Sequence, residues 1–403
     1  MKRKKILATI LIGVMALSTM VGCSSKKEEA STQKEITIWT KLPEKEVPVL
    51  KESAEKWAEQ TGNKVTVIRD DGDFQAFLQA ANSSKGPDIY FGSAHNQLAA
   101  YSDAGIVTEV PEELINKEDF ISDAVWDATT IEGKTYAIPL GIETTALYYN
   151  KDLVKEVPKT MDELIEVASG LGEGSFQFNL LDPYTNLGFI LTPGGYIFGG
   201  EDGNLDPTDI GLANDGAKKG YKVLQDLVLK NKFMTVDIRD DVALNNFKEG
   251  KSAFYISGPW NIQTLKESGL NFGIAQMPTI DGKEYTALSG IQVGFVSSKA
   301  KDIDLSWECL DFLIKDTQNG LYEKGKIPVV KEMLEKEEVK NDEFVSAFLK
   351  AASVAVPMPN IREMDAVWSP LNNTIRILQG EDIDTVANEI VEGIKEGILL
   401  QNQ

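Results

Sequence analysis

The sequence of 403 residues predicts an α/β fold arranged as two lobes. Strand-like alternation and helical spacing of apolar residues take turns along the chain, which predicts strands joined by helical crossovers. The length corresponds to two or three units of about 150 residues, enough to bury a substantial core. Beyond residue 35 no long linker divides the chain, so we expect two lobes joined by short crossing segments.

The early elements follow one another as strand, helix, strand, helix and strand, which implies a parallel sheet. In order, they are a strand at 36–40, a helix over 49–58 with Gly62 as its cap, a strand at 64–69, a helix over 74–81 and a strand at 88–91. The same style resumes later, with helices over 164–171 and 217–228, a strand at 252–256 that turns at Gly258-Pro259, and a helix over 386–394.

The composition excludes several classes of function. The 62 acidic and 41 basic residues give a net charge of −21, which argues against a nucleic-acid partner. A hydrophobic fraction of 42% is too high for a disordered chain. One His and two Cys leave little for His-rich metal sites or a His-dependent triad, so we expect no metal and no cofactor.

The first residues resemble an export signal. Residues 1–5 are basic and 6–20 are apolar, a run too short and wrongly flanked for a transmembrane helix. The run ends in Met20-Val21-Gly22-Cys23, which resembles a bacterial lipoprotein cleavage box. We expect a signal peptide at 1–22 and acylation of Cys23; the alternative is an ordinary signal peptide with an incidental Cys.

Residues 23–35 then form a polar, aperiodic tether to the folded body. If Cys23 is acylated, Cys309 is the remaining thiol, so a disulfide within the mature chain is impossible. Cys309 lies in an apolar run and is expected to be buried. Removal of the four basic residues of 1–5 leaves 37 basic and 62 acidic residues, a net charge of −25.

Enzyme motifs are incomplete. Gly133-Lys134-Thr135 lacks the first Gly of a phosphate loop, and Gly170-Leu171-Gly172-Glu173-Gly174 lacks the last Gly of a dinucleotide fingerprint. An EF-hand-like run at 202–213 lacks its turn Gly and closing Glu, and no Gly-x-Ser-x-Gly elbow occurs. Most of the abundant carboxylates are expected to be a solvated surface.

Six collinear segments nevertheless resemble one family, the solute-binding proteins of bacterial ABC sugar importers, and most closely its maltose/maltodextrin-binding members. The segments are Gly86-Pro87-Asp88-Ile89, Tyr148-Tyr149-Asn150-Lys151-Asp152-Leu153, Phe178-Asn179-Leu180-Leu181-Asp182-Pro183-Tyr184, Gly194-Gly195-Tyr196, Ser257-Gly258-Pro259-Trp260, and Met358-Pro359-Asn360-Ile361 followed by Trp368.

The resemblance implies a two-lobed periplasmic-binding-protein-like fold with a ligand cleft between the lobes and a hinge of crossing segments. Closure about that hinge would trap the ligand. Transferred to this chain, the N-terminal lobe would comprise 36–140 plus 294–336, and the C-terminal lobe 144–286 plus 344–403.

The resemblance also implies ligand-binding residues. A sugar presents a flat C–H face to aromatic rings and a rim of hydroxyls to polar groups. The family's stacking rings match Tyr184, Trp260 and Trp368, and its hydroxyl-binding acids match Glu143 and Asp182. Each has a structural alternative: the tryptophans would fill a core, Glu143 would be an exposed strand end, and Asp182 a turn residue.

The first lobe departs from the family pattern. An Asp-Arg pair is replaced by Asn96-Gln97, and the family's Asp-Lys falls near Glu44-Lys45. A Tyr and an Arg after the last Trp are replaced by Ser369 and Asn372. His95 would lie near the cleft, either as a pH switch or as a structural residue. The exact sugar and chain length are therefore left open.

The expected function is that of an extracellular substrate-binding lipoprotein of an ABC importer. It would be a monomer and not an enzyme, anchored outside the cytoplasmic membrane through Cys23. It would deliver maltodextrin-type oligosaccharides to permease subunits. The alternatives are the same role for another oligosaccharide, a secreted glycoside hydrolase using Glu143 and Asp182, or a structural lipoprotein without a small ligand.

Overall fold

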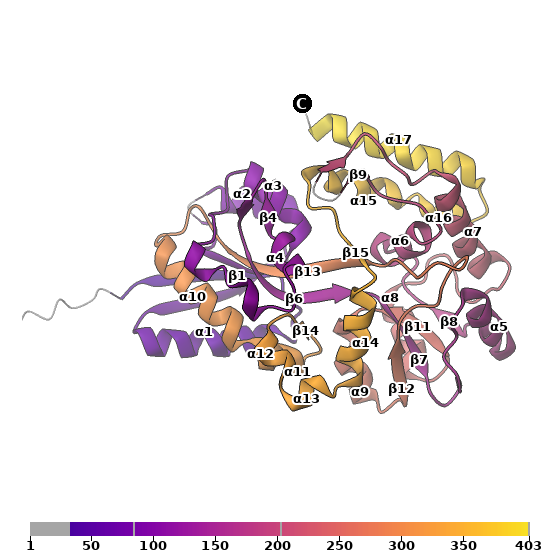
Figure 1. The fold of residues 1–403 in the computed structure, drawn as a ribbon, viewed down its shortest axis with the longest axis horizontal. Coiled ribbons are helices and arrows are strands. Elements are labelled where there is room, and N and C mark those ends of the chain that lie inside the picture. Colours follow the sequence, from indigo (N-terminus) through magenta and orange to yellow (C-terminus); the bar gives the residue numbers. More distant parts are fainter. Residues whose placement is uncertain (1–32, 84, 202–203, 402–403) are drawn as a thin grey trace, which may run out of the picture. The chain divides into compact units, whose positions relative to one another are not determined.

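The computed structural model describes residues 33–83, 85–201 and 204–401. The signal peptide and the acylation of Cys23 predicted above lie outside these residues. All the helices and strands belong to a unit that begins at Lys34 (Figure 1).

The larger sheet holds the first predicted strands. Its order is β14-β6-β13-β3-β1-β2, and β15 pairs with β13. The strands are β1 (Glu35–Thr40), β2 (Lys64–Arg69), β3 (Ile89–Ala94), β6 (Ile138–Thr144), β13 (Leu288–Val296), β14 (Ile327–Pro328) and β15 (Val356–Pro357). β1 is parallel to both β2 and β3, as predicted. β13 is antiparallel to β3 and β6, so the sheet is mixed.

The crossover between β1 and β2 shows why these residues fold as they do. The helix α1 (Val47–Thr61) buries Leu50, Ala54 and Trp57, which are spaced to lie on one face. It ends at Gly62, whose φ of 72° is left-handed and suits a residue without a Cβ.

A second sheet has the order β12-β7-β11-β8. These strands are β7 (Ala146–Asn150), β8 (Phe176–Gln177), β11 (Phe254–Ser257) and β12 (Phe272–Ala275). β7 is antiparallel to β11 and β12, and β8 is parallel to β11. Two small hairpins complete the strands, β4 (Thr130–Ile131) with β5 (Lys134–Thr135), and β9 (Gly199–Glu201) with β10 (Asn204–Asp206).

Helices cover both sheets (Figure 1). The α-helices after α1 are α2 (Phe74–Ala81), α3 (Leu98–Asp103), α4 (Ala124–Asp127), α5 (Met161–Leu171), α6 (Pro183–Leu191), α7 (Asp215–Leu229), α8 (Asp240–Lys248), α9 (Ile262–Ser268), α10 (Ile303–Asp316), α11 (Gln318–Glu323), α12 (Lys331–Leu334), α13 (Glu337–Lys340), α14 (Glu343–Ala352), α15 (Asp365–Leu371), α16 (Thr374–Leu378) and α17 (Ile383–Gln401). Short 3₁₀ turns are η1 (His95–Gln97), η2 (Glu112–Leu114), η3 (Lys117–Asp119), η4 (Pro259–Asn261) and η5 (Arg362–Met364).

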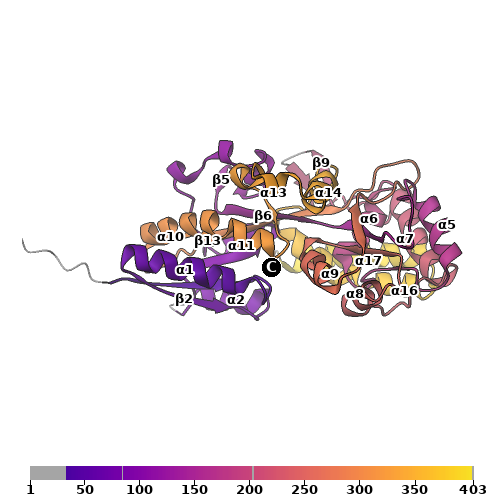
Figure 2. The ribbon, with the colours of Figure 1, turned by 90° about the horizontal axis from the view of Figure 1, so that it is seen from below.

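Buried side chains form two separate hydrophobic cores, which define the two lobes. The first core lies around α1, α10 and β1, and the second around α6, α7, α17 and β7. Cys309 is fully buried in the first core, as expected from its sequence context. The lobes lie side by side in both Figure 1 and Figure 2.

Two long strands run from one lobe to the other. Along β13, Leu288 belongs to the second core and Val293 to the first. On β6, Ile142 packs against both cores. The return of β13 from the second lobe explains its antiparallel direction. Side chains near these strands are therefore placed where the lobes meet.

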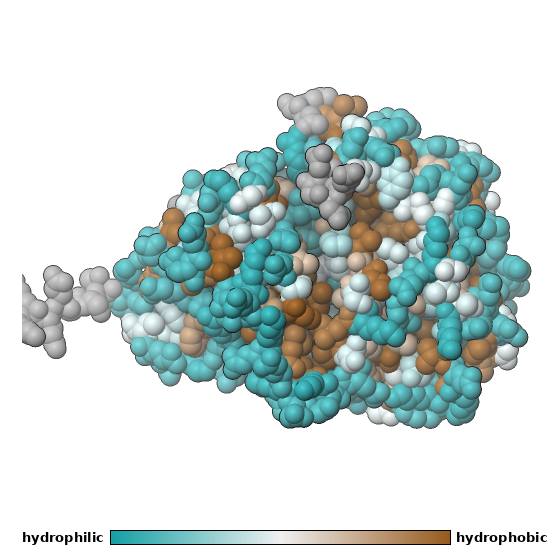
Figure 3. Space-filling model, viewed as in Figure 1, coloured by the Kyte–Doolittle hydropathy of each residue, from teal (hydrophilic) through white to brown (hydrophobic). Residues whose placement is uncertain are grey.

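The face seen in Figure 3 is mostly polar, and apolar side chains gather towards its middle. No helix within the described residues has the length and apolar character needed to cross a membrane.

Candidate functional site

Glu143 lies near the end of β6, opposite Gly290 of β13. Its Oε1 accepts a hydrogen bond of 2.7 Å from Gln292 Nε2 and lies 3.6 Å from Lys326 Nζ. The side chain is 26% exposed, so it is not simply an exposed strand end. Burial raises the pKa of the Glu143 carboxyl above its ordinary value, and the positive charge of Lys326 opposes that rise.

Lys326 and Glu46 complete this cluster, and sequence reasoning missed both, as it missed Gln292. Lys326 Nζ lies 3.2 Å from Glu46 Oε2, and the two side chains are only 5% and 2% exposed. Glu46 precedes α1, whereas Lys326 precedes β14, about 280 positions away. Nothing in their local sequence distinguishes them from the many surface charges.

Asp182 and Tyr184 begin α6. Asp182 is the N-cap: its Oδ1 accepts from the Tyr184 N–H at 3.0 Å and its Oδ2 from the Thr185 hydroxyl at 3.0 Å. The alternative that Asp182 is a structural turn residue therefore describes one of its roles. Burial raises its carboxyl pKa, against the effect of those two bonds.

Tyr184 joins this helix to the crossing strands. Its hydroxyl donates to the carbonyl oxygens of Leu288, at 3.2 Å, and Glu143, at 3.5 Å. Burial raises the pKa of the phenol well above its ordinary value. The hydroxyl proton is therefore already used, so Tyr184 has no hydroxyl donor left for a ligand.

Trp260 and Lys45 meet across the lobes. Lys45 Nζ, from the segment before α1, donates to the carbonyl oxygen of Trp260 at 2.6 Å. Burial lowers the pKa of the Lys45 ammonium. Trp260 is half-buried and belongs to neither core, and its ring lies against Gly258, where an added Cβ would clash with the indole. This placement does not favour the core-filling alternative for Trp260.

A third group lies on η1 and α15, which are joined by the contact of η1 with η5. Asn96 is 7% exposed, and its side chain makes no hydrogen bond with another described residue. Gln97 Oε1 accepts from the Tyr101 hydroxyl at 2.8 Å. Trp368 is half-buried against the second core, so the alternative that this tryptophan fills a core is partly correct. Asp365, one turn before Trp368, was also missed; burial raises its carboxyl pKa.

Two remaining candidates have clear placements. Glu44 is exposed and makes no hydrogen bond or ion pair with a described residue. His95 is buried: its Nδ1 accepts from the Ile291 N–H at 3.1 Å, and its Nε2 lies 3.2 Å from the Met358 carbonyl. Burial lowers the pKa of the imidazole to about 4. This geometry favours the structural role over a switch near neutral pH.

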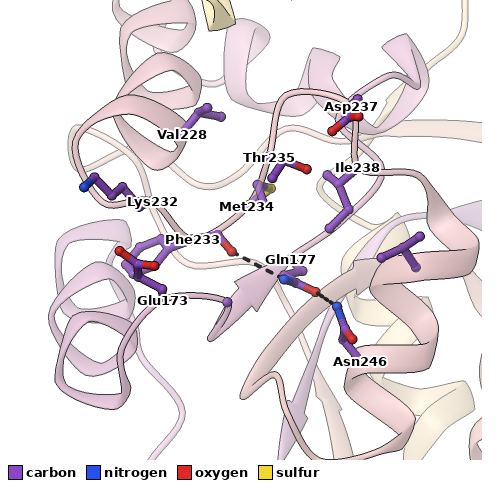
Figure 4. A pocket seen from close by; sticks show the side chains of 12 residues that line it. Glu173, Gln177, Val228, Lys232, Phe233, Met234, Thr235, Asp237, Ile238 and Asn246 are labelled. Carbon is purple, nitrogen blue, oxygen red and sulfur yellow. Dashed lines mark hydrogen bonds between the residues drawn. The ribbon is translucent and has the colours of Figure 1, made fainter.

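A separate cavity of about 670 Å³ lies in the second lobe, between β8, the end of α7 and the start of α8. None of the predicted site residues lines it. Figure 4 shows Gln177 in its wall, bonded to Asn246 at 2.8 Å and to the Phe233 carbonyl at 3.5 Å. Both ends of this amide are therefore occupied. In the described chain, no group of three or more His, Cys, Asp or Glu could hold a metal ion.

Glu143 and Tyr184, and Lys45 and Trp260, thus lie in contact where the two α/β lobes meet. The chain belongs to the family of bacterial extracellular solute-binding proteins, whose pattern matches residues 52–347.

Three relatives refine this assignment. The chain is 31% identical to the maltooligosaccharide ABC transporter solute-binding lipoprotein of Streptococcus pneumoniae, with 99% of both chains covered. It is 27% identical to the galactooligosaccharide-binding protein of Bacillus subtilis, covering 93% of this chain and 92% of that one. The maltose-maltodextrin binding protein of Alicyclobacillus acidocaldarius superposes with a TM-score of 0.84 at 30% identity, covering 90% of this chain and 100% of that one. The predicted two-lobed fold is confirmed.

Proposed function

We propose that this chain is the substrate-binding lipoprotein of an ABC importer, that it captures maltodextrin-type oligosaccharides in a cleft between its lobes, and that it delivers them to permease subunits. The observation that carries the proposal is that hydrogen bonds to backbone carbonyls, from Tyr184 to Glu143 and from Lys45 to Trp260, bring these four residues to the junction of the lobes. These side chains combine ring faces with polar groups, which suits a sugar.

The ligand is proposed from the relatives and from the site chemistry together. The full-length relative in Streptococcus pneumoniae is named for maltooligosaccharides. Tyr184, Trp260 and Trp368 supply three rings, each contributing about 0.5–1.5 kcal/mol if aromatic-pair values transfer. Micromolar affinity requires about 8 kcal/mol, so Glu143 and other polar contacts must add the remainder.

A galactooligosaccharide is the second candidate. A relative in Bacillus subtilis is named for that ligand, and the first lobe offers the uncharged Asn96 and Gln97 in place of an Asp-Arg pair. Isothermal titration calorimetry with malto-oligosaccharides of two to seven units and with galacto-oligosaccharides separates the two. We expect saturable heat with the first series only. Binding of galacto-oligosaccharides without malto-oligosaccharides would overturn the substrate assignment.

We propose no catalytic role. Both Asp182 oxygens are bonded to the start of α6, and Glu143 Oε1 is bonded within its own cluster. A glycoside hydrolase needs two carboxyls free to face the scissile bond. Incubation with maltoheptaose should release no new reducing ends, whereas their appearance would restore the hydrolase hypothesis.

The anchor, the monomeric state and the lobe limits complete the proposal. Acylated Cys23 would hold the protein on the outer face of the cytoplasmic membrane, and Cys23→Ala should release it into the medium.

The lobe limits stay as 36–140 plus 294–336 and 144–286 plus 344–403. The two cores support most of this division, although Ile327 and Met333 pack in the second core.

A further inference from the structure

A lysine enclosed by two carboxylates lies where the crossing strands meet. Lys326 Nζ is 3.2 Å from Glu46 Oε2 and 3.6 Å from Glu143 Oε1, and it also donates to Gln292 Oε1. The Glu143 side chain is 26% exposed and Gln292 is half-buried, whereas Lys326 and Glu46 are buried. Lys326 thus lies between two carboxylates in a poorly solvated place, and the ammonium of Lys45 is a second positive charge near Glu46.

The backbone places Lys326 beside Glu143. Ile327 of β14 pairs with Ile142 of antiparallel β6, so Lys326 lies opposite Glu143. From there its aliphatic stem crosses Gly141, where an added Cβ would lie 2.9 Å from Lys326 Cγ. Gly141 therefore leaves the space that lets the ammonium reach past β6.

The cluster fixes the orientation of the Gln292 amide. Its oxygen accepts from Lys326, and its nitrogen donates to Glu143 Oε1 at 2.7 Å. The reverse orientation would set a nitrogen against the ammonium and an oxygen against the carboxylate, so only one orientation satisfies both neighbours. Lys326 thereby acts on Glu143 both directly and through Gln292.

One oxygen of Glu143 remains available. Oε1 accepts from Gln292 and faces Lys326, whereas Oε2 makes no hydrogen bond with another residue that the structure describes. A half-buried carboxylate oxygen without a partner is a hydrogen-bond acceptor for a ligand. A buried ion cluster is costly and is often no more stabilising than apolar residues, so stability alone does not explain this one.

We propose that Lys326 and Gln292 are positioning residues for ligand recognition. They hold Glu143 as a carboxylate whose Oε2 is directed to accept a hydrogen bond from a sugar hydroxyl. Glu46 weakens the effect of Lys326 on Glu143, because it shares the same ammonium group. This inference rests on the proposed function. The ligand chemistry it selects is a neutral, hydroxyl-bearing oligosaccharide that donates one hydrogen bond to Glu143.

A dependence on pH follows. The titratable groups facing Glu143 are Lys326 beside β14, Glu46 before α1 and Tyr184 on α6. On α14, which packs against β6, Glu343 pairs instead with Lys151 at the surface. The carboxylate is the accepting form, so affinity is full above the pKa of Glu143 and falls as the pH falls through it. Removal of Lys326 raises that pKa further, which moves the fall to higher pH.

The test measures the Kd for maltotriose by calorimetry from pH 5 to pH 8.5. Lys326→Met should weaken binding at least tenfold at pH 6 and less at pH 8.5, and Lys326→Arg should recover most of the affinity. Glu46→Gln frees Lys326 for Glu143 and should shift the fall in affinity to lower pH. Lys315→Met, which removes an exposed lysine on α10, is the matched control and should leave the profile unchanged.

An unchanged Kd for Lys326→Met at every pH overturns the inference. If Lys326→Met does not fold, Gln292→Met replaces it. That change keeps the charges and removes only the hydrogen bonds that link Lys326 to Glu143 through the Gln292 amide. The ligand-free protein gives a second arm, in which the Glu143 carboxyl is titrated by ¹³C NMR and assigned with Glu143→Gln. If the parent protein binds no sugar, the proposed function fails, but the NMR titration still tests the inference. An unshifted Glu143 titration in the Lys326 variant overturns the inference.

Discussion

Trp260 and Trp368 differ in how much the fold depends on them. Trp260 belongs to neither hydrophobic core, and its contact with the other lobe is made by its backbone oxygen. Trp368 is packed against the second core. Its indole therefore contributes to the stability of the fold whether or not a ligand is bound, whereas the Trp260 indole contributes little to that stability.

Alanine replacements should separate these contributions. We expect Trp260→Ala to weaken maltodextrin binding about tenfold or more, about 1.4 kcal/mol, with little change in Tm. Trp368→Ala should weaken binding similarly and also lower Tm, because it leaves a gap against the core. Calorimetry and thermal unfolding measure the two effects. Tyr196→Ala removes another exposed ring of the second lobe as a control; unchanged affinity in both Trp variants would contradict the stacking role.

Asp182 has a capping role that must be separated from any contact with the ligand. Asn also caps helices well, so Asp182→Asn should preserve stability, whereas Asp182→Ala should cost about 1 kcal/mol of unfolding free energy. If Asp182 also binds a hydroxyl through its charge, Asp182→Asn should still lose affinity. Urea unfolding and calorimetry on the pair decide; full affinity in Asp182→Asn would leave capping as its sole role.

At the scale of elements, His95 ties η1 to β13 and to the segment that follows β15. It accepts from Ile291 of β13 and lies within hydrogen-bond distance of the Met358 carbonyl, just beyond β15. These bonds need a neutral imidazole whose Nε2 carries the proton, because Nδ1 must accept. The lowered pKa, caused by burial, keeps the ring neutral through the physiological range.

The sign of the resulting pH effect is defined. The imidazole pKa falls from 6.5 to about 4 on folding, so its contribution is fully present above pH 6.5 and is lost as the pH falls towards 4. At pH 4.5 the loss is about 2–3 kcal/mol. Urea unfolding at pH 7 and pH 4.5 should show that the parent protein loses this much more than His95→Gln. Equal losses in the two proteins would contradict the neutral, buried role.

Local patterns were sufficient for the early elements. The predicted strands at 36–40 and 64–69 correspond to β1 and β2, and the helix between them ends at Gly62 as expected. Apolar periodicity and helix capping depend on residues that are close together in the chain, so both can be predicted from the sequence. The antiparallel β13 was not foreseen, because its direction depends on the return of the chain from the other lobe.

The same distinction applies to the site. Glu143, Asp182 and Tyr184 were predicted as ligand-binding residues through a family resemblance, and the structure places them close together beside the crossing strands. Lys326 and Glu46 carry no local signal, since each looks like one more surface charge until β14 and the start of α1 are packed together. Pairing across about 280 residues is a property of the tertiary fold.

At the scale of the whole folded unit, two cores are joined by continuous strands and by a few polar contacts. The bond from Lys45 to the Trp260 carbonyl and the cluster around Lys326 lie at the lobe junction. Such sparse contacts between separate cores permit relative movement of the lobes. We expect ligand binding to exploit this freedom, with contacts drawn from both lobes.

A crystal structure of the protein with maltotriose tests the central claim most directly. The account predicts a sugar at the lobe junction, with a hydroxyl within hydrogen-bond distance of Glu143 Oε2 and ring faces against Tyr184, Trp260 and Trp368. A saturating ligand bound elsewhere, for example in the cavity beside Gln177, with Glu143 and the three rings untouched, would contradict it.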